Sequence, residues 1–343
     1  MIVARKLDLG RGWFRASGAD GDVVISSRIR LGRNIDGFLF CDMLDNAERE
    51  ALAFRLRSVI QGHRNTYSRF QVAQQDKQIR TVLLERTLLN AKSNEIDEVF
   101  VRVDQRCVVI PFDGEHVTLV GVRSGLELRE IFQDLSRLAD RIDRDLPFAV
   151  SLHWGYVGAD PLASGALMQA SALLHLPALV ELGDPQSAFA ALSAAGIRLE
   201  VFRSGQTNSL ANVYQITTAP ICGATEDQIL IQLEKAVRGL VHYEREARAQ
   251  LLQSRRQETA ESMQRAIGLL RYASAIRAEE ALALLSWIRL GVALELTEEI
   301  SMEEVTELLF VSQRCHVMHA SATGKDEDDR RADLLRQRLA AHG

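Results

Sequence analysis

The sequence predicts an α+β fold followed by an all-helical region, and three observations predict it. A run rich in β-branched residues at 98–122 contains the dipeptide Asp113-Gly114 between two apolar stretches, which is typical of a β-hairpin. Apolar residues recur at helical spacing on both sides of that run. From Thr225 onward almost every segment has helical periodicity. The change of pattern predicts two domains, residues 1–250 and 251–343.

Composition limits the classes of protein to consider. The chain has 343 residues, of which 47% are hydrophobic, so a large buried core is expected. A net charge of −5 gives no indication of binding to nucleic acid or to an anionic membrane. No apolar run has the length of a membrane span, and the first residues do not resemble a signal peptide. The four cysteines form no CxxC pair. We therefore expect reduced thiols and a cytoplasmic location.

The elements before residue 225 are expected in the following order. Residues 45–94 are predicted to be mostly helical, with Asp45 as the first cap, and residues 124–146 return to helical period. Residues 148–160 are predicted as a strand. A largely buried helix is predicted for residues 163–183, and strands are predicted at 197–204 and 213–221.

The elements after residue 225 are all predicted to be helices. Thr225 and Gln228 form a capping box before a long amphipathic helix that runs toward Arg255. Ser301 and Glu304 form a second capping box. The remaining helices are expected at residues 258–276, at 277–294 and, as a short one, in the charged tail.

The stretch DVVISSRIRLGRN, residues 22–34, places three arginines, Arg28, Arg30 and Arg33, directly after an apolar run. Guanidinium groups are planar forks that bind phosphate oxygens in pairs, so a cluster at a strand suits a phosphate group. The alternative is that the three arginines form a solvated charged face.

Together with this stretch, four further segments carry a resemblance to a known family: SGLELREIFQDLSRLADRIDRDLPFA, ASALLHLPAL, NVYQI and TEDQILIQLEKAVRGLVHYEREAR. The chain resembles the bacterial protein-arginine kinases, which are ATP:guanido phosphotransferases like creatine and arginine kinases. IGLLRYA and ALALLSWIRLGVAL are similar to the C-terminal domain of the protein-arginine kinases.

The resemblance implies a small helical N-terminal part, a guanidino-kinase-like antiparallel sheet flanked by helices, and an all-α C-terminal domain. It implies that the ATP phosphates are held by the residues of the SSRxR motif, which are Ser26, Ser27, Arg28, Ile29 and Arg30. Mg²⁺ would arrive with ATP, and a homodimer is a family-level expectation.

Most of the family's reactive positions are nevertheless replaced. Gly114, in FDGEH, stands where the resemblance places the catalytic base, a glutamate. Asp113 and Glu115 flank Gly114, but we expect their side chains to point to opposite faces, so that neither replaces the base. Other family positions that contact nucleotide or substrate are occupied by Thr87, Thr118, Asp160, Gln169, Glu200 and Gly205. Among these, Thr118, Gln169 and Glu200 replace arginines.

The contributions that such residues make to the reaction rate favour a loss of catalysis. A positioned base contributes about 10²–10⁴ in rate, and a transition-state arginine contributes about 10³–10⁵. We expect an inactive or strongly impaired pseudokinase that binds protein clients or regulatory partners in bacterial protein quality control. The alternative is an active protein-arginine kinase with relocated groups, for which Arg123 and Arg203 are candidate cations. Whether the chain is an enzyme, and whether it uses ATP with Mg²⁺, is left open, and no catalytic or metal-binding residue is assigned.

The remaining interpretations concern three single residues and one short motif. His116 and His175 are interpreted as structural, with His175 hydrogen-bonded in the core. Asp160 is a candidate to pair with an arginine side chain of a client. The family's phosphoarginine-binding motif RDxxRA corresponds to EDDRRA, in which Asp328, Arg331 and Ala332 match and Glu327 replaces the first arginine. Phosphoarginine binding there is a hypothesis.

Overall fold

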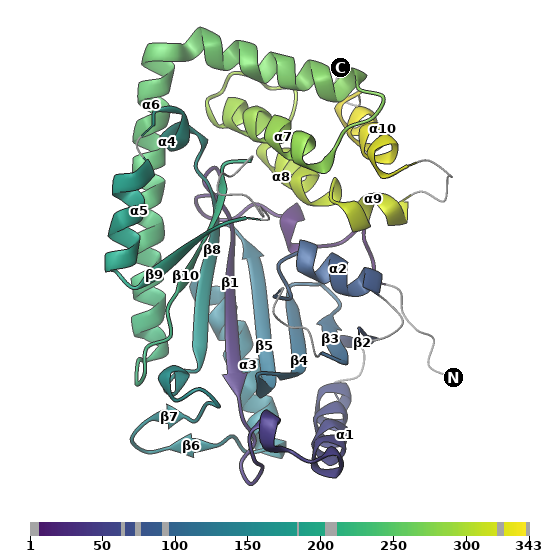
Figure 1. Cartoon of the computed structure of the whole chain (residues 1–343), viewed down its shortest axis with the longest axis vertical. Helices are drawn as coiled ribbons and strands as arrows, with labels where there is room; N and C mark the ends of the chain where they lie inside the picture. Colours follow the sequence, from purple (N-terminus) through teal and green to yellow (C-terminus); the bar gives the residue numbers. More distant parts are fainter. Residues whose placement is uncertain are drawn as a thin grey trace.

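The computed structural model describes residues 7–62, 66–72, 77–90, 96–183, 185–202, 211–320 and 326–340. Its centre is an eight-stranded antiparallel sheet with the strand order β2-β3-β4-β5-β1-β8-β10-β9 (Figure 1). The strands are β1 Val24–Arg33, β2 Tyr67–Gln71, β3 Glu98–Arg102, β4 Cys107–Asp113, β5 Glu115–Ser124, β8 Met168–His175, β9 Ile197–Val201 and β10 Val213–Thr218. A separate two-stranded ribbon consists of β6 Val150–Ser151 and β7 Gly155–Tyr156.

Helices cover one face of the sheet. Helix α3, Leu128–Asp145, packs on β1 and β5, and the first half of α6, Glu226–Tyr272, packs on β8 and β10. Ile29 and Leu31 of β1 belong to the apolar core beneath these two helices. The other elements of this part are η1 Trp13–Arg15, η2 Cys41–Met43, α1 Asn46–Gly62, α2 Lys77–Glu85, η3 Pro161–Ala163, α4 Pro177–Glu181 and α5 Pro185–Ala194.

The C-terminal part is all-α, as the sequence predicts. Helix α6 has non-helical dihedrals at Arg255, and Figure 1 shows that it rises beside the sheet and then crosses above the remaining helices. These are α7 Ala278–Ala293, α8 Met302–Val311, α9 Arg314–Ala320 and α10 Glu327–Ala340. Phe310 of α8 contacts Trp13 and Phe14 of η1, with ring centroids 4.8 and 5.3 Å away. A second apolar core therefore joins the C-terminal helices to the sheet. The predicted α+β class is confirmed, and the division at residue 250 stays a prediction.

Local signals in the sequence are confirmed where side chain and backbone interact at short range. Gly114 has φ +84° in the turn between β4 and β5. Asp45 Oδ1 accepts a hydrogen bond from the amide of Glu48 at the start of α1. Both predicted capping boxes, at the starts of α6 and α8, are present.

Two element predictions are wrong. Residues 168–175, placed in a buried helix, form β8, and only the short α4 is helical beyond them. β8 lies between β1 and β10 and is buried along almost its whole length, and a short apolar run of this kind has no period that separates strand from helix. The strand predicted at 148–160 is reduced to the two-residue β6 and β7. The described part of the region 45–94 is mostly helical, as predicted, although strand β2 interrupts it.

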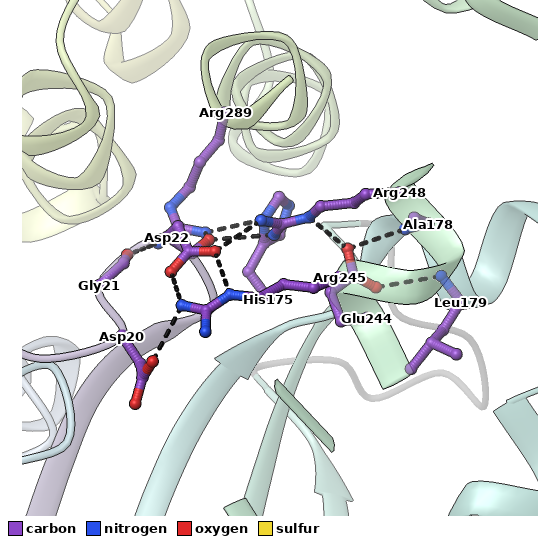
Figure 2. Close-up of polar contacts among 10 residues, drawn as sticks. All are labelled: Asp20, Gly21, Asp22, His175, Ala178, Leu179, Glu244, Arg245, Arg248 and Arg289. Carbon is purple, nitrogen blue, oxygen red and sulfur yellow. Dashed lines mark hydrogen bonds and ion pairs between the residues drawn. The ribbon is translucent and has the colours of Figure 1, made fainter. Parts of the chain in front are cut away.

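A buried polar contact ties the C-terminal helices to the end of β8 (Figure 2). Arg289 of α7 donates through Nη1 to Nδ1 of His175, 2.9 Å away, and to the carbonyl of Asp22, 3.0 Å away. Because a guanidinium only donates, Nδ1 of His175 is the acceptor, and its protonated Nε2 donates to Ser286 Oγ at 2.9 Å. Burial, and then the positive charge of Arg289, lower the pKa of His175 well below its ordinary value. The interpretation of His175 as a hydrogen-bonded core residue is confirmed.

Helix α6 completes this contact from the other side. Glu244 accepts hydrogen bonds from the amides of Ala178 and Leu179 at the start of α4, and from Nε of Arg248 at 2.9 Å. Nη1 of Arg248 pairs with Asp22, 3.0 Å away. Asp22 precedes β1, so the network fixes the chain just before β1 and just after β8.

His175→Gln is expected to reduce the loss of stability on acidification. Below pH about 6.5 the unfolded histidine takes up a proton that the buried His175 does not, so the folded state loses up to about 1.4 kcal/mol per pH unit from this residue. Glutamine keeps an acceptor and a donor but does not titrate. Urea unfolding at pH 7 and pH 5 measures the difference, with the exposed His242→Gln as control. An equal pH dependence in His175→Gln and the unaltered protein would show that His175 is not the neutral group described.

Candidate functional site

Two adjoining cavities lie on the face of the sheet opposite α3. Side chains alternate along β1, so Arg28 and Arg30 share the face that Ile29 and Leu31 do not occupy. We call the first the acidic cavity; its volume is about 480 Å³, and its lining includes Arg30, Asp42, Asp113, Gly114, Glu115, Thr118, Asp160 and Gln169. We call the second the Arg28 cavity; its lining includes Arg28, Glu85, Thr87, Gln169, Arg198, Glu200, Gln215 and Thr217. Gln169 lines both.

Arg30 already has a carboxylate partner within the site. Its Nη2 lies 2.6 Å from Oδ2 of Asp113, and the two side chains are only 14% and 10% exposed. Nη1 of Arg30 is buried and has no hydrogen-bond partner. The positive charge of Arg30 is therefore largely neutralised before any ligand enters.

Arg28 is in the opposite situation. It is 6% exposed, and Nη1 donates to the carbonyl of Thr87 at 3.0 Å. Among the described residues no carboxylate forms an ion pair with it. Burial, followed by repulsion from Arg30, lowers the pKa of Arg28 to about 9, which leaves the guanidinium charged at neutral pH. Arg28 is a buried cation that faces a cavity without a counter-ion.

Glu115 is a partly desolvated carboxylate. Its Oε2 accepts hydrogen bonds from Nδ2 of Asn34 and from the amide of Ala159. Burial, and in addition the negative charges of Asp160 and Asp42, raise its pKa above the ordinary value. Within the described part of the chain, Oε1 accepts no hydrogen bond and is available to a donor.

The expectation that Asp113 and Glu115 point to opposite faces is wrong. Both line the acidic cavity. They are direct partners across the tight turn at Gly114, and partners across an antiparallel pair place their side chains on the same face. The turn, and not the alternation of one extended strand, decides their direction.

The replaced family positions surround the two cavities. Gln169 is the β8 partner of Arg30, and Thr118 donates through Oγ1 to the carbonyl of Asp113. Thr87 and Glu200 line the Arg28 cavity. Asp160 lines the acidic cavity, where Oδ1 also accepts from the amide of Leu162 at 2.9 Å. Arg203 and Gly205 lie outside the described residues.

The five residues predicted to hold ATP phosphates do not share one environment. Arg28 and Arg30 line the cavities, whereas Ile29 is fully buried in the core beneath α3. Ser27 is also buried and donates to the carbonyl of Gly125 at 2.6 Å, and Ser26 is 3% exposed. Contact of these five residues with a nucleotide stays a prediction.

Two candidate residues are explained by contacts outside the site. Arg123, a candidate relocated cation, pairs with Asp134 of α3 at 2.6 Å, on the face of the sheet away from the cavities. Nδ1 of His116 accepts from the amide of Ile35, and its Nε2 lies 2.7 Å from the carbonyl of Leu39. The structural interpretation of His116 is confirmed.

The candidate phosphoarginine pocket is internally neutralised. Arg331 is fully buried and pairs with Asp328 at 2.6 Å and with Glu327. It also donates to the carbonyls of Ser312 and Ile276, each 2.8 Å away. Ala332 is buried beside it, and phosphoarginine binding there stays a prediction. Glu327 stands where the family motif has an arginine. Its carboxylate pairs with the guanidinium of Arg331, which a phosphate would need.

The donor set of the cleft does not fit a magnesium nucleoside triphosphate. Such a ligand needs several cations that absorb the charge of the phosphates. The charged lining residues in the described ranges are three arginines, of which Arg30 is paired, and six carboxylates. The same ranges contain no group of three or more His, Cys, Asp or Glu side chains that could hold a metal ion.

Comparison with known proteins identifies the family. The model of the ATP:guanido phosphotransferase C-terminal catalytic domain matches residues 50–247, and that of the protein-arginine kinase McsB C-terminal domain matches residues 256–343. The chain therefore belongs to the ATP:guanido phosphotransferases, a family of ATP-dependent kinases. Within that family it is similar over nearly its whole length to bacterial protein-arginine kinases.

The relatives are distant. A protein-arginine kinase of Symbiobacterium thermophilum is 29% identical over 96% of this chain and 96% of its own length. One of Halothermothrix orenii is 28% identical over 95% and 96%. Lombricine kinase has the same fold, with a TM-score of 0.58 and 17% identity over 73% of this chain and 72% of that one. No helix in the described ranges is both long and apolar enough to cross a membrane.

Asp113→Ala is expected to cost about 3 kcal/mol in the free energy of unfolding, because it leaves Arg30 buried without a counter-charge. In a double-mutant cycle with Arg30→Met, the coupling energy is expected to exceed about 1 kcal/mol. Urea denaturation measures each corner of the cycle. The more exposed pair Arg271–Glu299, 2.8 Å apart, is the control and is expected to couple by less than about 1 kcal/mol. Additive effects at Arg30 and Asp113 would contradict the described pairing.

Proposed function

We propose that the chain is a non-catalytic member of its family that binds arginine side chains of proteins in the acidic cavity. The observation that carries the proposal is the charge of that cavity. Arg30, the only arginine among the described lining residues, is already paired with Asp113, and further carboxylates, Asp42, Glu115 and Asp160, surround the remaining space. A guanidinium is attracted to such a cavity, whereas a phosphoryl group is repelled from it.

The chemistry of transfer supports loss of catalysis. Phosphoryl transfer to a guanidinium needs cations around the migrating group and a carboxylate that accepts a proton from the attacking nitrogen. Gly114 supplies no side chain at the position that the family resemblance gives to this base. Arg123 is held on the opposite face of the sheet, so it does not replace a lost cation.

Guanidinium binding, in contrast, needs only carboxylate oxygens with free acceptor capacity. Oε1 of Glu115 has that capacity, and the amide of Ala159 and Asn34 hold Oε2 in place. A hydrogen bond from a guanidinium to the carboxylate oxygen Oε1 is charge-assisted and roughly twice as strong as one between neutral groups. Asp42 and Asp160 are exposed at the same cavity and add to the attraction.

The similarity to protein-arginine kinases extends to the C-terminal helical domain, which supports protein clients as partners. We place the chain as a binding or regulatory module in bacterial protein quality control. A cytoplasmic location and a homodimer are part of the same proposal.

An active kinase with relocated groups is the second candidate, and one observation favours it. Asp113 and Glu115 lie in the same cavity as Arg30, and the raised pKa of Glu115 is a property that suits a general base. This candidate requires a phosphoryl group to enter among the carboxylates named above.

A transfer assay separates the two candidates. Purified protein incubated with ATP, Mg²⁺ and an arginine-rich protein is expected to form no acid-labile phosphate above background, because base and counter-charges are lacking. The Symbiobacterium thermophilum protein-arginine kinase serves as the positive control. Phosphoarginine formation that is abolished by Glu115→Gln would establish the active candidate instead.

Glu115→Gln is expected to weaken binding of an arginine-rich peptide about tenfold or more, since a charge-assisted hydrogen bond contributes about 1.5–3 kcal/mol. The melting temperature is expected to stay equal or to rise, because at neutral pH the buried charge of Glu115 costs stability. Fluorescence anisotropy and thermal unfolding measure the two effects, with the exposed Glu258→Gln as control. Unchanged peptide affinity would exclude Glu115 from the binding site.

A further inference from the structure

We propose that the cleft recognises a C-terminal arginine, with the guanidinium in the acidic cavity and the terminal α-carboxylate at Arg28. This inference rests on the proposed function and names the form of arginine that the site prefers. It assigns a role to Arg28 other than the binding of a phosphate chain.

The two cavities form one continuous path for such a residue. Gln169 lines both, and Arg28 and Arg30 project from the same face of β1. Two residues of a strand span about 6.6 Å. The Cα atom and the guanidinium carbon of an extended arginine are separated by five bonds of about 1.5 Å, which gives roughly 6 Å between them. The extended side chain is therefore about as long as the spacing along β1 between Arg28 and Arg30, which line one cavity each.

Arg28 is built to receive one anionic group. It is 94% buried, one of its nitrogens donates to the carbonyl of Thr87, and none of its other N–H groups has a hydrogen-bond partner in the described structure. A carboxylate offers two oxygens to the guanidinium fork. Desolvation strengthens the pairing, because the charge of Arg28 is already removed from water.

The surroundings of Arg28 favour a single negative charge over several. Glu200 lines the same cavity and acts electrostatically on Arg28, although the two side chains form no ion pair. The carboxylate of Glu85 is there too, and its two oxygens are held by His316 and by the amide of Cys315. Besides Arg28, the described lining has one further cation, Arg198, so a triphosphate would meet two carboxylates with only two arginines to offset its several charges.

The rest of the lining suits a peptide end. Gln169, Gln215 and Thr217 are uncharged and can exchange hydrogen bonds with the last peptide group. In free L-arginine the α-nitrogen is an ammonium, whose positive charge would lie near Arg28. In a C-terminal residue that nitrogen is a neutral amide, so we commit to the peptide and use free arginine as a competitor.

The test compares three fluorescent peptides of one composition: one that ends in arginine with a free carboxylate, one that ends in arginine amide, and one with the arginine placed internally. The free acid is expected to bind about tenfold more tightly than either of the others. Arg28→Gln is expected to abolish this ratio, because it weakens binding of the free acid most. Arg137→Gln, on the exposed side of α3, is the control and is expected to keep the full ratio.

Each contrary outcome has a distinct meaning. Equal binding of acid, amide and internal peptides by the unaltered protein overturns this inference and leaves the proposed function standing. No binding of any of the three overturns the proposed function and the inference with it. Displacement of the free-acid peptide by micromolar MgATP, or by free L-arginine as effectively as by unlabelled peptide, also overturns the inference. The comparison of acid with amide uses the unaltered protein, so it holds even if Arg28→Gln fails to fold.

Discussion

Arg30 of β1 and Asp113 at the end of β4 meet at 2.6 Å, and the character of the cleft follows from that contact. The pair neutralises Arg30, the one cation among the described residues that line the acidic cavity, so the remaining carboxylates set the sign of the electrostatic potential. Arg28, two residues away on the same strand face, has no ion-pair partner among the described residues, so its charge stays unpaired. One strand thus presents a neutralised arginine beside a carboxylate cavity and a free arginine beside a second cavity.

The scaffold that holds this cleft does not depend on the residues that line the two cavities. β1 and β8 carry the central lining residues. A network of arginines and carboxylates fixes the start of β1 and the end of β8 (Figure 2). Arg289 contributes from the C-terminal helices, and the cluster of Trp13, Phe14 and Phe310 joins the same two parts of the molecule. Because these contacts lie outside the cavities, the fold tolerates replacement of the reactive residues that line them.

The sequence predicted features that depend on short-range contacts or on family resemblance. The hairpin at Gly114, the capping boxes and the α+β class are of this kind. β8 was missed because its burial on both faces depends on strands distant in sequence. The turn at Gly114 decides where the Glu115 side chain points. Tertiary packing brings Asn34 within hydrogen-bond distance of Glu115 and places Asp42 in the acidic cavity. Asn34 directly follows Arg33, the last of the three arginines. That position is the one sequence signal that could have indicated the role of Asn34.

The central claim is that too little positive charge is left in the cleft to hold a nucleoside triphosphate. Thermal unfolding in the presence of increasing MgATP tests it most directly, because a ligand that binds only the folded state at 100 times its Kd adds about 2.7 kcal/mol to stability. We predict an unchanged melting temperature up to millimolar MgATP. A saturable, magnesium-dependent rise with a midpoint at micromolar concentration would contradict the account.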